Sequence, residues 1–138
     1  MSQLKRFGVA LDDETLKHFD SHLKIQSYTN RSEAIRDLIR AEFVRSEWEK
    51  KKGDVVCVLT IVYDHHQRGL VNKLLQIQHD QPSEILCTQH VHLDHDKCLE
   101  VVIAKGKANN LRKFSTSVKA AKGVKFTGMT LASTGKEV

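Results

Sequence analysis

The sequence predicts an α+β protein built from two small domains. Two observations support this class: a strand pattern and two helix patterns come first, and alternating strand and helix patterns fill the rest. The chain is 138 residues long, which suits two small domains. Hydrophobic residues make up 40% and charged residues 28% of it, which are globular values and exclude wholesale disorder.

The first domain is expected to begin with a short strand at residues 5–11, because apolar side chains alternate there with others. The inward set is Phe7, Val9 and Leu11, and the outward set is Arg6, Gly8 and Ala10. Asp12 and Asn30 are predicted to cap two helices, since each precedes an acidic first turn and an apolar stripe at helical spacing. The stripes are Leu16, Phe19 and Leu23, then Ile35, Leu38, Ile39 and Phe43.

One strand and two helices make a poor monomer, because the strand has no partner for its hydrogen bonds and the core is small. Two copies solve both problems when their strands pair into an antiparallel ribbon under four helices. We therefore predict that residues 1–50 form a ribbon-helix-helix domain that exists only as a dimer.

A polar hinge at residues 50–53 is expected to separate the domains, and residues 54–138 should form the second one. Strand patterns (S) and helix patterns (H) follow in the order S55–63, H70–77, S85–93, S98–104, H111–121 and S124–131. This βαββαβ order predicts a ferredoxin-like domain of the ACT type.

The segment HVHLDHDKC at residues 90–98 contains the richest set of metal donors. His90 and His92 lie two apart on a predicted strand and therefore share a face. If the following turn pairs His92 with Cys98, it pairs His90 with Glu100. Two imidazoles, a thiol and a carboxylate would then occupy one patch of the sheet.

The opposite face would be apolar, which suits covering helices. It would carry Ile85, Cys87, Val91, Leu99, Val101 and Ile103. Because a βαββαβ unit places both helices on one face, we expect the histidine face to be free of helices and either exposed or covered by another subunit. Cys57 and Cys87 are expected to be core residues, since a buried free cysteine behaves as a small hydrophobe.

Imidazole and thiolate donors together favour Ni(II), copper or zinc over magnesium or calcium. His79, at the end of the first helix of this domain, is the remaining candidate for a fourth ligand. His65 and His66 are expected at the start of a helix and His95 in the turn, so all three are more simply explained as solvated residues. Weak binding of a secondary metal by these histidines stays an open alternative. A single histidine on a strand would also be read as a surface residue, but two on one face opposite a cysteine favour a metal site.

Three runs closely resemble the NikR family of nickel-responsive repressors, and the similarity spans residues 4–132. The runs are NRSEAIRD at 30–37, QHD at 78–80 and TQHVHLDHDKCLE at 88–100. The resemblance implies a square-planar nickel site with ligands His90, His92 and Cys98 from one subunit. It implies that His79 of a neighbouring subunit is the fourth ligand, and that Gln78 and Glu100 lie around the site.

The resemblance also implies a homotetramer, a dimer of dimers, that binds palindromic operator DNA when loaded with Ni(II) and represses nickel-uptake genes. Arg6, Gly8 and Ala10 would face the DNA, although the family usually has an arginine and two hydroxyl residues there. Gly8 and Ala10 lack side chains that can hydrogen-bond to bases, so the operator cannot be inferred. Glu33 and Asp37 match positions that help to hold another cation, and a solvated helix face explains them equally well.

Two other classes of function compete with this hypothesis. A metal-independent ribbon-helix-helix repressor with a small-molecule-sensing ACT-like domain would leave the metal patch unexplained. A metalloenzyme or storage protein is disfavoured because we find no carboxylate pair, Ser-His-Asp set or phosphate loop, and we expect no enzyme activity. The sequence contains neither an apolar run long enough for a membrane nor a signal core, so a cytoplasmic protein is expected.

Overall fold

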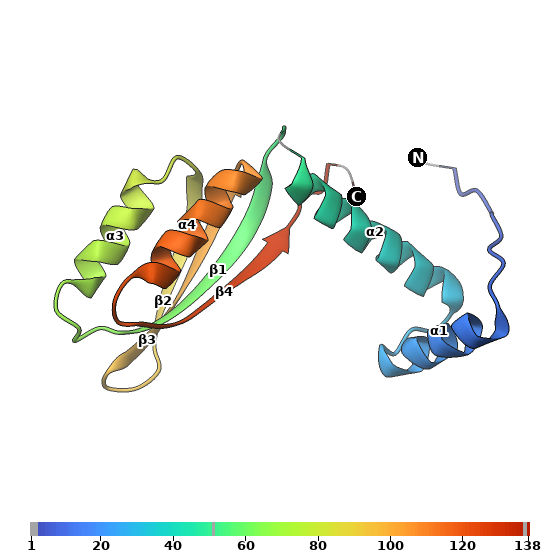
Figure 1. The fold of residues 1–138 in the computed structure, drawn as a ribbon, viewed down its shortest axis with the longest axis horizontal. Helices are drawn as coiled ribbons and strands as arrows, with labels where there is room; N and C mark the ends of the chain where they lie inside the picture. The colour runs from blue at the N-terminus through green and yellow to red at the C-terminus, as the bar shows by residue number, and fades with distance from the viewer. Residues whose placement is uncertain (1–2, 51, 137) are drawn as a thin grey trace. The chain divides into compact units, whose positions relative to one another are not determined.

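The computed structural model describes residues 3–50, 52–136 and 138 (Figure 1). The chain folds into two compact units, of which the first ends at Arg40 and the second begins at Ala41. Helix α2 crosses this boundary, so its last turns belong to the second unit.

The first unit contains helix α1 (Asp13–Ile25) and the start of helix α2 (Arg31–Glu49). Both predicted caps are confirmed. Oδ1 of Asp12 accepts a hydrogen bond from the backbone N–H of Thr15 at 2.8 Å, and Oδ1 of Asn30 accepts one from that of Glu33 at 3.0 Å. These bonds satisfy amides that a helix leaves unpaired in its first turn.

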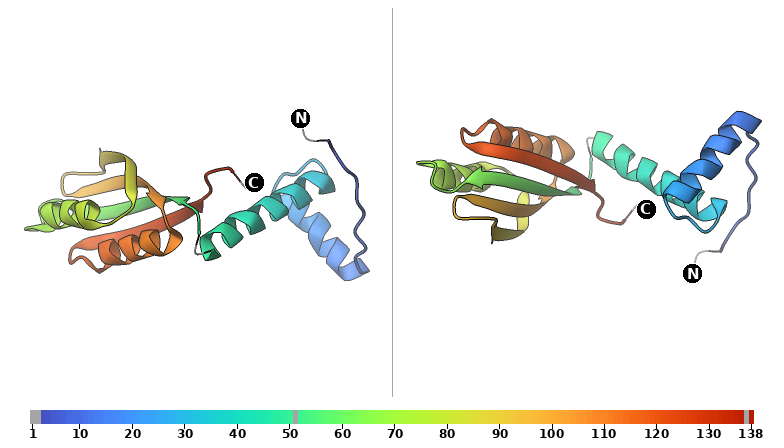
Figure 2. Two further views of the ribbon diagram at one scale, coloured as in Figure 1. Left: turned by 90° about the horizontal axis from the view of Figure 1, so that it is seen from above. Right: turned by 90° about the horizontal axis from the view of Figure 1, so that it is seen from below.

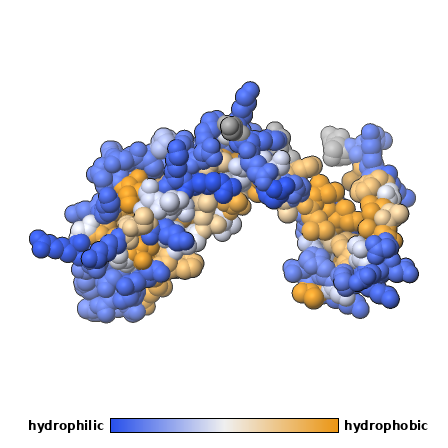
Figure 3. Space-filling model, viewed as in Figure 1, coloured by the Kyte–Doolittle hydropathy of each residue, from blue (hydrophilic) through white to orange (hydrophobic). Residues whose placement is uncertain are grey.

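Residues 3–12 form neither helix nor strand, so the strand predicted at 5–11 is not formed in the single chain. The physical reason is that a strand exists only by hydrogen bonding to a partner. Its apolar side chains are open to solvent: Phe7 is 70% and Val9 59% exposed. Together with Leu38 and Ile39 of α2 they give the N-terminal unit the apolar surface visible in Figure 3.

The second unit has the predicted βαββαβ order. Its elements are β1 (Val55–Asp64), α3 (Leu70–Asp80), β2 (Glu84–His92), β3 (Lys97–Gly106), α4 (Ala108–Ala120) and β4 (Val124–Ala132). The strands form one sheet in the order β2-β3-β1-β4, with antiparallel neighbours throughout. This is the ferredoxin-like topology, and α3 and α4 pack on the same face of the sheet (Figure 1, Figure 2).

The core lies between that face and the two helices. Alternate strand residues point into it, as the two-residue period of a strand requires. The strand set is Cys57, Leu59, Ile61, Tyr63, Cys98, Val102 and Ala104, and the helix set is Leu70, Leu74, Leu111, Phe114 and Val118. Trp48 of α2 closes one end of this core, and its indole N–H donates to the carbonyl oxygen of Ala132 at 2.9 Å.

The prediction that the face carrying His92 and Cys98 is free of helices is wrong. Cys98 and Glu100 are buried on the helix-covered face, whereas Leu99, Val101 and Ile103 are only half-buried on the helix-free face. The pattern of apolar residues gave the wrong face because both faces of β3 carry apolar residues. Alternation alone therefore could not tell which face the helices cover.

The prediction for Cys87 is also wrong. Cys87 is exposed, because it lies on the helix-free face of β2, and β2 is an edge strand. Cys57 is buried in the core as predicted, and burial raises the pKa of its thiol.

Candidate metal centre

Strands β2 and β3 bring the candidate metal ligands together through the predicted register. His92 pairs with Cys98, and His90 pairs with Glu100. The turn between the strands is fixed by Asp94, whose Oδ1 accepts hydrogen bonds from the backbone N–H groups of Asp96 at 2.8 Å and Lys97 at 2.7 Å. These bonds hold the pKa of Asp94 below its usual value, because they favour the charged carboxylate.

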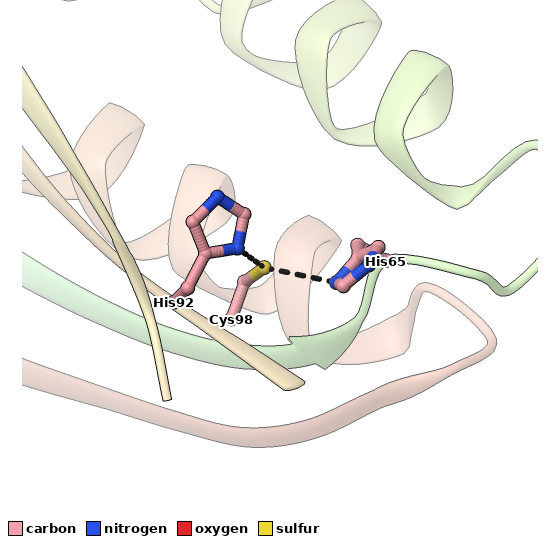
Figure 4. Close-up of side chains that lie close together, drawn as sticks. All are labelled: His65, His92 and Cys98. Carbon is pink, nitrogen blue, oxygen red and sulfur yellow. Dashed lines mark hydrogen bonds between the residues drawn. The ribbon is translucent and has the colours of Figure 1, made fainter. Parts of the chain in front are cut away.

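Three donor side chains converge at the end of the sheet (Figure 4). The Sγ atom of Cys98 lies 3.2 Å from Nδ1 of His65 and 3.4 Å from Nδ1 of His92. One donor atom from each residue lies within 4.8 Å of those of the other two. The sulfur is buried, His65 is half-buried and His92 is exposed, so the group opens outward on one side.

His65 is the member of this group that sequence reasoning treated as a solvated residue. It was expected at the start of a helix, but α3 begins only at Leu70, and His65 lies in the turn directly after β1. Its backbone N–H donates to the carbonyl oxygen of Asp96 at 3.1 Å, which joins this turn to the β2–β3 turn. No local motif marks this position, because the contact depends on the pairing of β1 with β3.

His90 is exposed and lies outside this donor group, although its ring centroid is 5.0 Å from that of His92. A chain of hydrogen bonds orients it. The Tyr63 hydroxyl donates to Oε2 of Glu100 at 3.1 Å, and the side-chain amide of Gln78 donates to Oε1 at 2.9 Å. The Tyr63 oxygen also lies 3.3 Å from Nδ1 of His90. Since the single hydroxyl proton goes to Glu100, the oxygen is left to accept from Nδ1–H of His90.

That arrangement leaves the lone pair of His90 on Nε2, the atom turned away from Tyr63. Fixing an imidazole tautomer through a neighbour's hydrogen bond is how proteins prepare a histidine for metal ligation. Burial, and then the nearby Glu100, raise the pKa of Tyr63, so its hydroxyl keeps the proton that this chain of bonds requires.

The charges around Cys98 favour a bound cation. Burial first, and then the carboxylates of Asp94, Glu100 and Asp64, raise the pKa of the Cys98 thiol above its usual value. The thiol therefore keeps its proton in the metal-free protein, and a divalent cation would replace that proton. Two imidazoles and one sulfur fit borderline-soft metals such as nickel, copper and zinc.

The other predicted site residues lie apart from this cluster. His79 is exposed at the end of α3 and is not a member of this donor group. Arg6, Gly8 and Ala10 lie in the exposed segment before α1. In the first unit the carboxylate of Glu33 accepts from the Thr29 hydroxyl at 2.6 Å and that of Asp37 from the Tyr28 hydroxyl at 2.9 Å. Both carboxylates line one shallow pocket.

Comparison with known proteins relates the chain to metal-responsive regulators. The family described as "NikR C terminal nickel binding domain" matches residues 56–132. A protein of Syntrophus aciditrophicus described as "Putative nickel-responsive regulator" is 49% identical over 136 residues, covering 99% of this chain and 98% of its own length. One from Solibacter usitatus with the same description is 50% identical over 138 residues, covering 100% of this chain and 99% of its own.

One solved structure matches part of the chain. The crystal structure of the ACT domain from a GTP pyrophosphokinase of Chlorobium tepidum covers 56% of this chain and all of its own, with a TM-score of 0.49 and 14% identity. None of the helices in the described part of the chain is both long and apolar enough to cross a membrane. The family match covers more than half of the sequence, and the relatives match nearly all of it. The chain therefore belongs to the NikR family of nickel-responsive regulators.

Proposed function

We propose that the protein is a Ni(II)-dependent DNA-binding repressor that acts in the cytoplasm and shuts off nickel-uptake genes. The observation that carries the proposal is the convergence of the Cys98 sulfur with imidazoles at the end of the sheet, in a chain of the nickel-responsive family. The thiol, the oriented imidazoles and the surrounding carboxylates form a preorganised donor set for a borderline divalent cation.

The proposed ligands are His90, His92 and Cys98 of one subunit and His79 of a neighbouring subunit. Two features support a ligand from another chain. β2 is an edge strand, so His90 and His92 remain exposed even though they lie on the helix-covered side. His79 is exposed and away from the donors of its own chain, so it is free to serve another. Bound nickel would supply bonds that join two subunits.

We further propose that the chain assembles as a homotetramer, a dimer of dimers. In the first unit, the exposed apolar residues of the N-terminal segment and α2 need a partner, because burial of apolar surface is the main driving force of association. In the second unit, the helix-free face of the sheet carries half-buried Leu99, Val101 and Ile103, which suit contact with another copy.

In this proposal residues 5–11 of two copies pair into the ribbon of a ribbon-helix-helix domain and enter the DNA major groove. Arg6 alternates with the apolar residues and would face the bases, so Arg6→Ala should weaken operator binding at least tenfold while nickel binding persists. Gly8 and Ala10 would allow close backbone approach without hydrogen bonds of their own. Glu33 and Asp37 are proposed to hold an additional cation when DNA is bound.

The decisive experiment is a titration of operator-containing DNA with the purified protein, with and without Ni(II). We expect nickel to tighten specific binding, and linkage requires DNA to tighten nickel binding by the same factor. His79→Ala should remove this nickel response while the DNA segment is untouched. An unchanged response in His79→Ala would refute the ligand across subunits. Equal DNA affinity with and without nickel would favour the alternative, a metal-independent repressor with a small-molecule-sensing domain.

A further inference from the structure

A groove of about 280 Å³ lies between α3 and α4, the two helices that pack on the same face of the sheet (Figure 1). Its floor is apolar, because half-buried Ile77 of α3 and buried Phe114 of α4 line it. Pro82, in the turn after α3, is a further apolar lining residue. Pockets for drug-sized ligands measure about 300–1,000 Å³, so this α3–α4 groove suits a smaller molecule.

The polar side chains around the floor offer unused hydrogen-bond donors. Lys73 of α3 and Lys113 of α4 line the groove and are exposed. In the described part of the chain, neither ammonium group has an ion-pair or hydrogen-bond partner, and the same holds for the side chains of Asn110 and Ser117. Two ammonium groups, one amide and one hydroxyl therefore line the groove without a protein partner.

Local hydrogen bonds already use acceptor groups at the end of α3. Oδ1 of Asp80 accepts from the side-chain amide of Gln76 at 2.7 Å. The side chain of Gln81 accepts from the backbone N–H of Ser83 at 2.8 Å and donates to its carbonyl oxygen at 2.6 Å. The groove thus has donors to spare and few acceptors, which favours a ligand that brings acceptors of its own.

The charges around the groove favour an anion. Helix α4 carries Arg112, Lys113 and Lys119 and no acidic residue. Asp80 is the only acidic side chain among the described residues that line the groove, so with Lys73 and Lys113 the lining is net positive. A cleft of one sign of charge concentrates ligands of the opposite sign. One carboxylate would leave an ammonium group unpaired, whereas two carboxylates on one ligand match both lysines.

We propose that the α3–α4 groove binds a small aliphatic dicarboxylate. One carboxylate accepts from Lys73 and the other from Lys113, which lie on different helices. The amide of Asn110 and the hydroxyl of Ser117 donate to the remaining carboxylate oxygens, and the carbon chain lies on the apolar floor. The site contains none of the proposed metal ligands, so it does not depend on the proposed function.

The test titrates glutarate into the full-length, metal-free chain at low ionic strength. Metal is left out because a dicarboxylate would bind it, and low salt keeps the attraction to the lysines unscreened. Calorimetry should show one saturable binding event per chain. Backbone amide NMR signals of residues 73–81 and 110–117 should shift in the same titration. A titration with neither saturable heat nor these shifts would refute the site.

Lys73→Ala and Lys113→Ala should each weaken glutarate binding about tenfold, because each removes a hydrogen bond between charged groups. Lys119→Ala is the matched control: it removes an exposed lysine of α4 that does not line the groove, and should weaken binding less than about twofold. A loss in Lys119→Ala as large as that in Lys113→Ala would overturn the proposal, since it would show a general attraction of anions to α4.

Two further measurements test the chemistry of the ligand. Sulfate and phosphate should bind more weakly than glutarate because they have no carbon chain for the apolar floor, and equal affinity would show a site for inorganic anions instead. Asp80→Asn should tighten glutarate binding, since it removes the negative charge that opposes the ligand. Weaker binding in Asp80→Asn would contradict the placement of a dicarboxylate beside α3.

Discussion

The Sγ atom of Cys98 lies 3.2 Å from Nδ1 of His65, although 33 positions separate the two residues in the chain. The antiparallel pairing of β1 with β3 sets Tyr63 opposite Cys98 and therefore brings the residues after β1 beside the start of β3. The buried thiol thus lies between His92, the last residue of β2, and His65, in the turn after β1.

The first prediction concerns which cysteine binds nickel. Cys98→Ser should abolish the thiolate-to-nickel charge-transfer absorption, because it removes the only sulfur in the donor groups of the described chain. Cys87→Ser should leave the absorption unchanged, since Cys87 is exposed on the helix-free face. Absorption spectra recorded during a Ni(II) titration test both variants, and loss of the band in Cys87→Ser would contradict the assignment.

A second prediction addresses the hydrogen bonds behind His90. Tyr63→Phe removes the oxygen 3.3 Å from Nδ1 of His90 while keeping the ring in the core. Because such partners fix the imidazole tautomer, nickel affinity should fall about 10- to 100-fold. Competition with a chelator of known affinity measures the loss. Tyr28→Phe, in the first unit, is the matched control, and an equal loss there would show that the effect is not specific to His90.

Nickel affinity should depend on pH through Cys98. The pKa of this thiol is raised above its usual value in the metal-free fold, so the thiol is protonated at neutral pH, and binding as a thiolate releases that proton. Affinity should therefore rise by up to about tenfold per pH unit from this one proton. Calorimetry in buffers of different ionisation enthalpy counts the protons released. The Cys98→Ser chain should release fewer.

The raised pKa of Cys98 makes the stability of the metal-free fold fall with pH, whereas it makes nickel affinity rise. A raised pKa favours the neutral thiol in the folded state, so the contribution of this thiol to the free energy of unfolding is present at lower pH. The contribution is lost as the pH rises through the folded value. Urea unfolding of the metal-free protein between neutral and alkaline pH should show a decline that is smaller in Cys98→Ser. An identical decline in both chains would show that titratable groups other than Cys98 cause the loss of stability.

The fifth prediction concerns the end of α2. Trp48→Ala should destabilise the second unit by about 3 to 5 kcal/mol, because it empties a fully packed aromatic position and leaves the Ala132 carbonyl without its donor. Equilibrium unfolding in urea measures the change. Arg45→Ala is the control: it removes only exposed ion pairs with Glu42 and Glu49, and should cost less than about 1 kcal/mol.

Local patterns in the sequence were sufficient to predict much of the structure. The caps at Asp12 and Asn30 and the βαββαβ order depend on neighbouring residues along the chain, so they could be predicted without knowing the fold. The register of β2 against β3 could also be predicted, because a short turn leaves little choice about which residues face each other. The pairing of His92 with Cys98 follows from that turn.

The contacts between segments far apart in the chain were decided only by the tertiary structure. The face covered by α3 and α4 could not be predicted because both faces of β3 carry apolar side chains, and packing rather than alternation chooses between them. His65 reaches Cys98 only through the β1–β3 pairing, which no local motif encodes. The sequence by itself determined the helix caps at Asp12 and Asn30, the order of elements and the donor motif, since these rest on short-range hydrogen bonding and periodicity. The tertiary structure decided which face was buried and which histidines met the sulfur, since these depend on contacts between residues far apart in the chain.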